Sequence, residues 1–332
     1  MPSTKILIVS PPPAQTYFYG PFRLESEVEI PELRDLSGPG ERLVIVRAGG
    51  VPQSVTDAEA TGTAVQLTAS EYLLTIPVIA RYYVANGNEV RVEIEPGVPS
   101  SDVSTYLLGS VFGALCHQNG LLPLHASAVA QDERVTAFLG DSGAGKSTLA
   151  ACLNRRGYTV VSDDICLIDP SNPANPRVIP VAGWLKLWNQ SLEHLGETPV
   201  EQNRVYSTDD KFRVFLPTDA PAGAAPALIA NIVFLTRDAA PATEPSLEPM
   251  PPLEAIAGLM RMTYVPYFPP LAGQQPRLFQ QCARMFQNAR AWRLTVPWDL
   301  ARLDAVLALI ERDLLHKPDH GSPQINTDQN QN

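Results

Sequence analysis

The chain has 332 residues, of which 45% are hydrophobic, and its formal net charge is −10. This length allows two domains of ordinary size, each able to bury a core. The acidic charge argues against nucleic acid as a partner, because the chain has no basic excess with which to neutralise phosphates.

The cysteines and the lengths of the apolar runs indicate where in the cell the protein is expected. Cys116, Cys152, Cys166 and Cys282 are scattered without metal-ligand spacing, so we expect reduced thiols and a cytoplasmic location. Apolar runs of membrane-spanning length and a signal-peptide pattern are both missing from the sequence, so no membrane partner is expected.

The first 97 residues are rich in β-prone segments and predict a small accessory domain. Asn86-Gly87 between alternating segments is a strong hairpin signal, because both turn residues must take positive φ. The alternation after this turn predicts one solvated face, which leaves open whether the strands pair with an extended peptide or only with water. Strands are predicted at 5–10, 42–47, 79–84 and 89–94.

A helix at 103–118 is followed by a predicted strand at 121–130, which carries His125, and by a turn at 131–133. A histidine among small and apolar residues is often a buried core residue. Its position fifteen residues before Gly140 also allows a role in a site, and the residues alone leave both readings open.

The segment from Gly140 to Thr148 matches the G-x-x-x-x-G-K-[ST] pattern of a phosphate-binding loop. A β-prone run at 134–139 precedes it, and a helix-prone run at 149–156 follows it. Glycines let backbone N–H groups point at phosphates, and the helix N-terminus adds a favourable dipole. The sequence therefore predicts a nucleoside triphosphate site. Its loop residues are Gly140, Asp141, Ser142, Gly143, Ala144, Gly145, Lys146, Ser147 and Thr148.

Asp163 and Asp164 follow a predicted strand at 158–162. Carboxylates at the carboxyl end of such a strand lie where ligands bind in open α/β sheets. One of them can hold Mg²⁺ together with Ser147, and the other is then free to accept a proton. The alternative is a pair in which both acids only steady the metal and water.

Further along the chain, Lys211 and Arg213 lie two residues apart, so they could contact phosphate or a substrate carboxylate, or form a solvated strand face. A helix at 299–315 is predicted to be capped by Asp299. The remaining predicted elements are a buried strand at 229–235, a helix at 277–290 and a polar, disordered tail at 317–332.

Together these residues resemble the catalytic core of HPr kinase/phosphorylase, and more closely its shorter relatives, the HPr-kinase-like serine kinases found beside genes for lasso peptides and similar ribosomally made peptides. The resemblance is strongest over residues 105–190. It rests on His125, the loop 140–148, Arg156-Gly157-Tyr158 and Ser162-Asp163-Asp164, and residues 185–188 are similar too. Weaker similarity extends to residues 19–26 and 30–33.

The resemblance implies roles for these residues. Lys146 would contact the β- and γ-phosphates, and Ser147 would ligate Mg²⁺. Asp163 would accept the proton of a substrate serine, Asp164 would act on the metal side, and His125 would lie near the transferred phosphoryl group or the Asp163 carboxylate. Relatives also suggest a homo-oligomer.

The chain departs from the bifunctional enzymes of this family. Thr148 stands where they carry glutamate, and Ala126 replaces the glycine after the histidine. Residues 184–189 lack the expected acidic and arginine signature, so the third metal ligand is unassigned, with Glu193 and Glu201 as candidates. A reverse, phosphorolytic reaction and HPr as substrate are therefore not expected.

We therefore expect an α/β fold, in which a P-loop kinase core of the HPr-kinase C-terminal-domain type with a mixed sheet (98–316) follows the β-rich N-terminal domain (1–97). The expected function is ATP- and Mg²⁺-dependent transfer of the γ-phosphoryl group to a serine of a peptide or protein, with a lasso-type precursor peptide as the favoured acceptor. The alternatives are a kinase for a small-metabolite hydroxyl and a non-catalytic nucleotide-binding regulator.

Overall fold

The computed structural model describes residues 14–315 apart from 35, 39, 62–63, 173, 182, 217–226, 239–243 and 298. The predicted strand at 5–10 and the predicted tail at 317–332 lie outside the described residues. None of the helices in the described ranges is long and apolar enough to cross a lipid bilayer.

The described residues before 97 form an eight-stranded sheet in the order β1-β2-β3-β8-β7-β6-β5-β4, in which β3 runs parallel to both of its neighbours. The predicted hairpin is confirmed: β7 and β8 pair across Asn86 and Gly87, and both turn residues have positive φ. The strands are β1 (Gln15–Tyr19), β2 (Phe22–Ser26), β3 (Arg42–Ala48), β4 (Glu59–Thr61), β5 (Val65–Leu67), β6 (Glu71–Ile76), β7 (Ala80–Ala85) and β8 (Glu89–Ile94).

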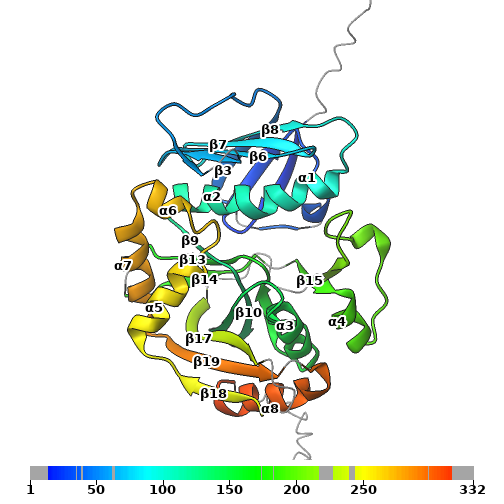
Figure 1. The fold of residues 1–332 in the computed structure, drawn as a ribbon, viewed down its shortest axis with the longest axis vertical. Coiled ribbons are helices and arrows are strands. Elements are labelled where there is room, and N and C mark those ends of the chain that lie inside the picture. Colours follow the sequence, from blue (N-terminus) through cyan, green and yellow to red (C-terminus); the bar gives the residue numbers. More distant parts are fainter. Residues whose placement is uncertain are drawn as a thin grey trace, which may run out of the picture.

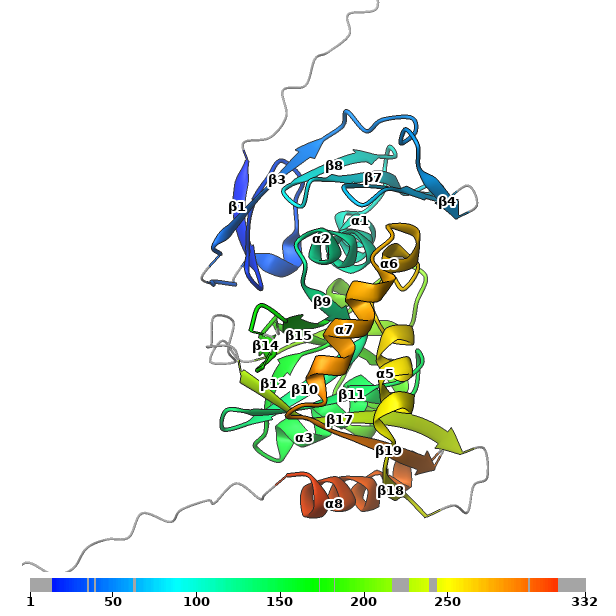
Figure 2. The same ribbon diagram turned by 90° about the vertical axis from the view of Figure 1, so that its left-hand side faces the viewer.

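A helical layer covers one face of this sheet and separates it from the rest of the protein (Figures 1 and 2). It consists of α1 (Ser100–Tyr106), the π-helical turn η2 (Leu107–Val111) and α2 (Phe112–Gln118), and the turn η1 (Pro31–Leu33) packs beside α1. The cluster of buried side chains that holds this layer to the sheet also includes Leu167 and Trp184 from the second half of the chain. This cluster therefore spans both halves of the chain.

The described residues that follow form a nine-stranded mixed sheet, in the order β12-β10-β11-β17-β14-β13-β9, with β19 paired to both β17 and β18. The strand predicted at 121–130 is two strands, because the chain breaks at His125 and its halves pair with different neighbours. The strands are β9 (Leu122–Leu124), β10 (Ala126–Gln131), β11 (Arg134–Leu139), β12 (Thr159–Ser162), β13 (Cys166–Asp169), β14 (Arg177–Ile179), β17 (Ala227–Asp238), β18 (Ser246–Pro249) and β19 (Arg290–Pro297).

Both faces of this sheet are covered, as the continuous apolar sequence of its central strands requires. Successive side chains of β11 alternate between the faces, with Phe138 on the side of α3 (Lys146–Arg155) and α8 (Leu303–Asp313). Ala137 and Leu139 face α5 (Pro252–Arg261) and α7 (Gln275–Met285). The predicted helix at 277–290 ends earlier than expected, because β19 begins at Arg290 and pairs in parallel with β17.

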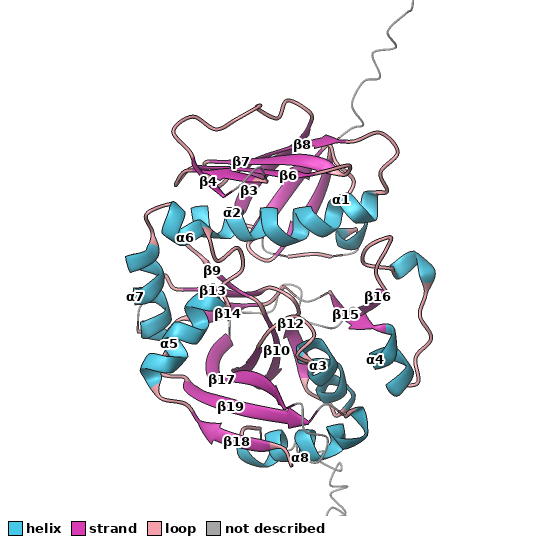
Figure 3. Cartoon of the chain, viewed as in Figure 1, coloured by secondary structure: helices cyan, strands magenta, loops and turns pink. Residues whose placement is uncertain are grey.

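A separate two-stranded hairpin, β15 (Trp184–Trp188) and β16 (Lys211–Phe215), lies beside α3 at the right of Figure 3. Helix α4 (Asn189–His194) follows β15, and the turn η3 (Glu201–Asn203) precedes β16. The hairpin register places Lys186 opposite Arg213 and Trp188 opposite Lys211. This small sheet brings two lysines toward the end of the nine-stranded sheet at which the loop lies.

The segment between α5 and α6 (Phe268–Leu271) packs tightly on α2. A Cβ atom added to Gly113 of α2 would lie 2.8 Å from the Val265 side chain and 3.0 Å from the Tyr264 ring, so only glycine leaves room for these two side chains against the helix. His117, one turn further along α2, shares a hydrogen bond of 2.9 Å with the Tyr264 carbonyl oxygen, and its ring stacks on Phe268.

Acid should destabilise the protein through His117. Burial lowers the pKa of His117 from its usual 6.5 to about 4. Between these values the unfolded chain binds a proton that the folded chain excludes, so the free energy of unfolding falls as the pH falls from 6.5 toward 4. The gap corresponds to about 3 kcal/mol. Urea unfolding between pH 7 and 5 should show a slope that His117→Gln removes.

His194, an exposed histidine of α4, offers the matched control. His194→Gln should leave the slope unchanged. An unchanged slope in His117→Gln, together with its loss in His194→Gln, would contradict the assignment.

Candidate functional site

The glycine loop connects a central strand to a helix. β11 ends at Leu139 and α3 begins at Lys146, so the predicted strand, loop and helix occur in that order. Gly143 and Gly145 have φ of 79° and 101°, in the left-handed region where other residues are strained. Gly145 is the last residue before α3, so the loop turns into the helix only because this position has no side chain.

Lys146 lies folded back over the loop. Its Nζ donates to the carbonyl oxygens of Gly140 at 2.7 Å and Asp141 at 3.1 Å. Burial lowers the pKa of Lys146, and the charges of Asp164 and Asp163 counteract this effect. The ammonium group is therefore held at the mouth of the loop by weak carbonyl partners, which an anionic ligand can replace.

Asp163 is buried and its carboxylate is occupied on both sides. Oδ1 accepts a hydrogen bond of 2.6 Å from the Ser127 hydroxyl of β10, and Oδ2 accepts one of 2.7 Å from the backbone N–H of Lys186 in β15. The residue thereby joins three segments of the chain. A group held in this way is suited to fixing the local structure, and the prediction that Asp163 accepts a substrate proton does not agree with this position.

Asp164 points the other way. Its φ of 68° turns the backbone after Asp163, so the two adjacent carboxylates diverge. The Asp164 Oδ2 accepts from Lys186 Nζ at 2.6 Å, and its Oδ1 lies 3.3 Å from Nδ1 of His125. Burial raises the pKa of Asp164, but Lys186 and His125 outweigh this effect and hold the pKa well below its usual range. Asp164 is therefore the ionised carboxylate of the site.

His125 occupies the break between β9 and β10. Its backbone N–H donates to the Met262 carbonyl oxygen at 2.7 Å, while its Nδ1 also lies 3.1 Å from the Asp164 carbonyl oxygen. The Tyr264 ring meets the imidazole edge to face, with 5.6 Å between the centroids. Burial, and then the negative charge of Asp164, raise the pKa of the Tyr264 hydroxyl. The histidine is thus a polar site residue and not a packed core residue.

His125, Lys146, Asp164 and Tyr264 line one cavity of about 670 Å³. Most of the predicted loop contributes to its wall, together with the predicted His125, Asp164 and Lys211. Gly140, Asp141, Asp163 and Arg213 do not belong to the described lining. The lining residues are His125, Ser142 to Leu149, Asp164, Lys186, Trp188, Gln190, Ser191, Lys211, Arg237, Tyr264, Val296, Pro297, Asp299, Leu300 and Leu303.

Several of these lining residues were not predicted from the sequence. Lys186 lies in the segment 185–188, which resembles the relatives. A charged residue between the buried Leu185 and Leu187 of β15 was the signal that could have identified it. Tyr264 and Arg237 gave no such signal, because only the tertiary packing of their segments brings them to the cavity. Glu193 and Glu201, the candidates for a third metal ligand, instead contact Asn189 and Arg204.

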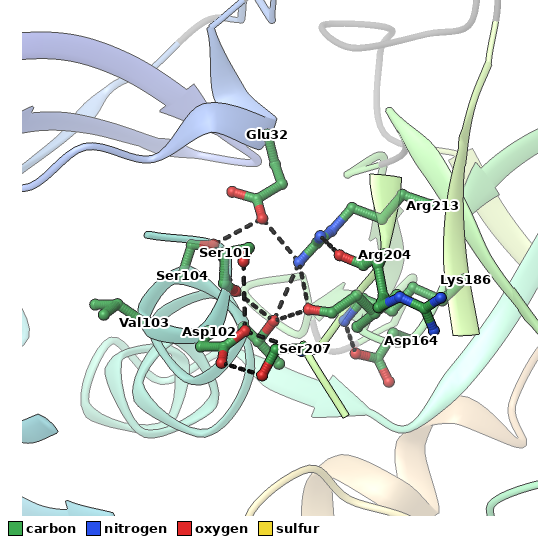
Figure 4. Close-up of polar contacts among 12 residues, drawn as sticks. Glu32, Ser101, Asp102, Val103, Ser104, Asp164, Lys186, Arg204, Ser207 and Arg213 are labelled. Carbon is green, nitrogen blue, oxygen red and sulfur yellow. Dashed lines mark hydrogen bonds and ion pairs between the residues drawn. The ribbon is translucent and has the colours of Figure 1, made fainter. Parts of the chain in front are cut away.

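The prediction that Lys211 and Arg213 act together is corrected. Lys211 lines the cavity and lies 5.6 Å from the centroid of the Trp188 ring. Arg213 projects from the same face of β16 but is buried, and its NH2 lies 2.8 Å from Oε1 of Glu32 in the N-terminal half (Figure 4). Both charged side chains are only 4% exposed. Arg213 therefore anchors the hairpin and does not contact a ligand in the cavity.

A wider network surrounds this ion pair. The Ser104 hydroxyl donates to Glu32 at 2.6 Å, and Arg213 also donates to Thr105 Oγ1 at 3.1 Å and to backbone carbonyls at 204 and 205. Asp102 of α1 accepts hydrogen bonds from the backbone N–H and the hydroxyl of Ser207 (Figure 4). The helical layer of the N-terminal half thus holds the segment that leads into β16.

The residues present fit a nucleotide and a hard cation. The loop supplies Lys146 and the N-terminus of a ten-residue helix, which favour phosphate. Asp164 and Ser147 both line the same cavity and offer oxygen ligands. Mg²⁺ in nucleotide sites takes one or two protein oxygens and completes its shell with phosphate and water. The described residues contain no group of three or more His, Cys, Asp or Glu arranged to hold a metal.

Comparisons with known proteins give little beyond these observations. No family model matches the chain, and no curated protein matches it. Among solved structures, the chain is similar to the Hpr(Ser) kinase/phosphatase from Coxiella burnetii, at 13% sequence identity over 57% of this chain and 94% of that one. The TM-score of 0.31 is too low to establish a shared fold or activity.

Replacing Asp163 should reveal its structural role. Asp163→Ala leaves the Ser127 hydroxyl and the Lys186 N–H buried without an acceptor, so we expect the free energy of unfolding to fall by about 3 kcal/mol. Asp163→Asn can keep both contacts, because its amide oxygen accepts from Lys186 while its NH₂ donates to the Ser127 oxygen. Its cost should stay within about 1 kcal/mol in urea unfolding. Equal losses in the two variants would contradict this account.

A double-mutant cycle should reveal the role of the buried ion pair. Arg213→Met leaves Glu32 charged and buried, so we expect a loss of about 3–5 kcal/mol in urea unfolding. The double variant Glu32→Leu with Arg213→Met should recover most of this loss, because two apolar side chains replace the pair. The exposed pair Arg23 and Glu25, 3.5 Å apart, provides the control and should couple by less than about 1 kcal/mol. Additive losses at Glu32 and Arg213 would argue against a direct interaction.

Proposed function

We propose that this chain is an ATP-dependent phosphotransferase that passes the γ-phosphoryl group to a hydroxyl. The observation that carries the proposal is the convergence of Lys146, Ser147, His125 and Asp164 on one cavity beside the glycine loop. Phosphoryl transfer requires mainly positioning and neutralisation of charge, and these four side chains supply both.

Each residue has a defined task in this proposal. Lys146 neutralises the terminal phosphates, while Ser147 and Asp164 would hold Mg²⁺. When bound, the cation would supply charge neutralisation at the phosphates. Asp164 suits this task because it stays ionised, with its pKa held well below the usual range. The proton acceptor is reassigned from Asp163 to His125, whose Nδ1 contacts Asp164 while the ring lines the cavity.

The Asp164 contact gives His125 a defined orientation. When Asp164 accepts from Nδ1–H, the second ring nitrogen, Nε2, is left unprotonated and can take the proton that an attacking hydroxyl releases. A substrate hydroxyl loses its proton late in a loose transition state, so a weak base is sufficient. Lys186 completes the arrangement by balancing the charge of Asp164 while no cation is bound.

A serine of a peptide or protein is the acceptor that we propose, and a ribosomally made, lasso-type precursor peptide is the favoured case. This choice is supported by the resemblance of residues 105–190 to HPr-kinase-like serine kinases. Trp188 and Lys211 of β15 and β16 line the cavity, and Trp188 is 42% exposed, so an extended acceptor could approach along these two strands.

The two aspartates give the sharpest test of the proposal. With labelled ATP, Mg²⁺ and a serine-containing precursor peptide, Asp164→Asn should lower the transfer rate by about 10²-fold or more. Asp163→Asn should keep the rate within a few-fold of wild type. Calorimetric ATP titrations should confirm that both variants still bind nucleotide. Loss of transfer in Asp163→Asn alone would return the catalytic role to Asp163.

The acceptor class is tested in the same assay. Label that reaches small molecules but never peptide would favour a metabolite kinase, and binding of ATP without transfer to any acceptor would favour a nucleotide-binding regulator. A variant outside the site, Asp169→Asn at the half-buried end of β13, should behave as wild type throughout.

A further inference from the structure

The cavity beside the loop has two chemically different ends. His125, Asp164, Lys186 and Tyr264 form a charged and polar end. At the other end, apolar side chains gather around a single carboxylate, that of Asp299. These apolar residues are Leu149, Val296, Pro297, Leu300 and Leu303.

The strand order fixes where these ends lie. His125 directly precedes β10 and Asp164 follows β12, and both strands lie on one side of the loop strand β11, whereas β17 and β19 lie on the other. β11, β17 and β19 are parallel, so their carboxyl ends meet at the same edge of the sheet. Strands are spaced by about 4.8 Å, so the end of β19 lies about 10 Å across the sheet from the loop strand.

We infer that the apolar end, formed by the last residues of β19 and by η4 (Leu300–Arg302), binds the base and ribose of the nucleotide. A nucleoside triphosphate is itself two-ended, with charged phosphates joined to a flat, largely apolar base. With its terminal phosphate toward Lys146 and Asp164, its base is directed to the side of β19. This inference rests on the proposed nucleotide site and adds the part of the cavity that distinguishes ATP from bare phosphates.

Arg237 lies between the two ends. It belongs to the carboxyl end of β17, and its NH2 would be 3.9 Å from a Cβ atom at Gly145, the residue that precedes α3. Burial lowers the pKa of this guanidinium. A cation above the start of α3 adds to the positive end of the helix dipole, so Arg237 is placed to bind the phosphates nearest the ribose.

Asp299 supplies the polar contact that an apolar pocket needs to orient its ligand. Its Oδ1 accepts a hydrogen bond of 2.9 Å from the Ala301 backbone, as the predicted cap requires. The carboxylate is thereby held at the start of η4. Its other oxygen can accept from a ribose hydroxyl or from an exocyclic amine of the base.

The inference is tested by comparing ATP with inorganic triphosphate, which has no base. Calorimetry on the full chain with Mg²⁺ should show tighter binding of ATP. Leu300→Gln, at a half-buried position, should weaken ATP binding by about tenfold and leave triphosphate binding within twofold. Val296→Thr, a milder change in the same wall, should weaken ATP binding in the same selective way. Thermal melting should show that both variants are folded.

Two variants serve as references. Leu253→Gln, 73% exposed on α5, should change neither affinity. Trp188→Ala tests whether the base stacks on Trp188 instead. If Trp188→Ala weakened the binding of ATP but not of triphosphate, and Leu300→Gln did not, the inference would be overturned.

Two further results would also overturn it. Equal losses for ATP and triphosphate in Leu300→Gln would remove the subsite while leaving the proposed phosphotransfer intact. Failure of the wild type to bind either ligand would remove both proposals.

Discussion

The Asp163 carboxylate joins three segments of the chain: β10 through Ser127, β12 through its own backbone, and β15 through the N–H of Lys186. The next side chain, that of Asp164, points away from Asp163, and the backbone at Asp164 has a positive φ. The charge of Asp164 then enters the cavity beside the glycine loop. The position of His125, the salt bridge to Lys186 and the path of β15 all depend on this one arrangement.

The N-terminal half supports the site and is more than an added domain. Its buried Glu32 holds Arg213 of β16, and Arg213 stands opposite Lys186, which in turn contacts Asp164 (Figure 4). A second connection runs from Gly113 of α2 to the segment that carries Tyr264 into the cavity. A buried ion pair contributes little net stability compared with apolar packing, but removing one partner is strongly destabilising because the other charge stays buried.

Local signals predicted much of the fold. The turn at Asn86-Gly87, the glycine loop with its flanking strand and helix, and the cap at Asp299 each depend on residues close together in the sequence, and the structure contains all three. The parallel strand β19 was missed, because its pairing with β17 brings together segments far apart in the chain. Whether residues 1–97 and 98–316 form separate domains stays a prediction, although α1 and α2 pack on the N-terminal sheet.

For the candidate site, too, the sequence predicted which residues come together but not how their side chains are oriented. The sequence indicated that His125, Lys146 and the two aspartates belong together, and the structure brings His125, Lys146 and Asp164 to one cavity. It could not show which aspartate faces the cavity, since that depends on Ser127 and on a backbone N–H more than twenty residues away.

The most direct measurement is a crystal structure with Mg²⁺ and a non-hydrolysable ATP analogue. The account predicts that the terminal phosphate lies beside Lys146, Ser147 and Asp164, with Asp163 still bonded to Ser127. A terminal phosphate beside Asp163, with Asp164 turned into the protein, would contradict it.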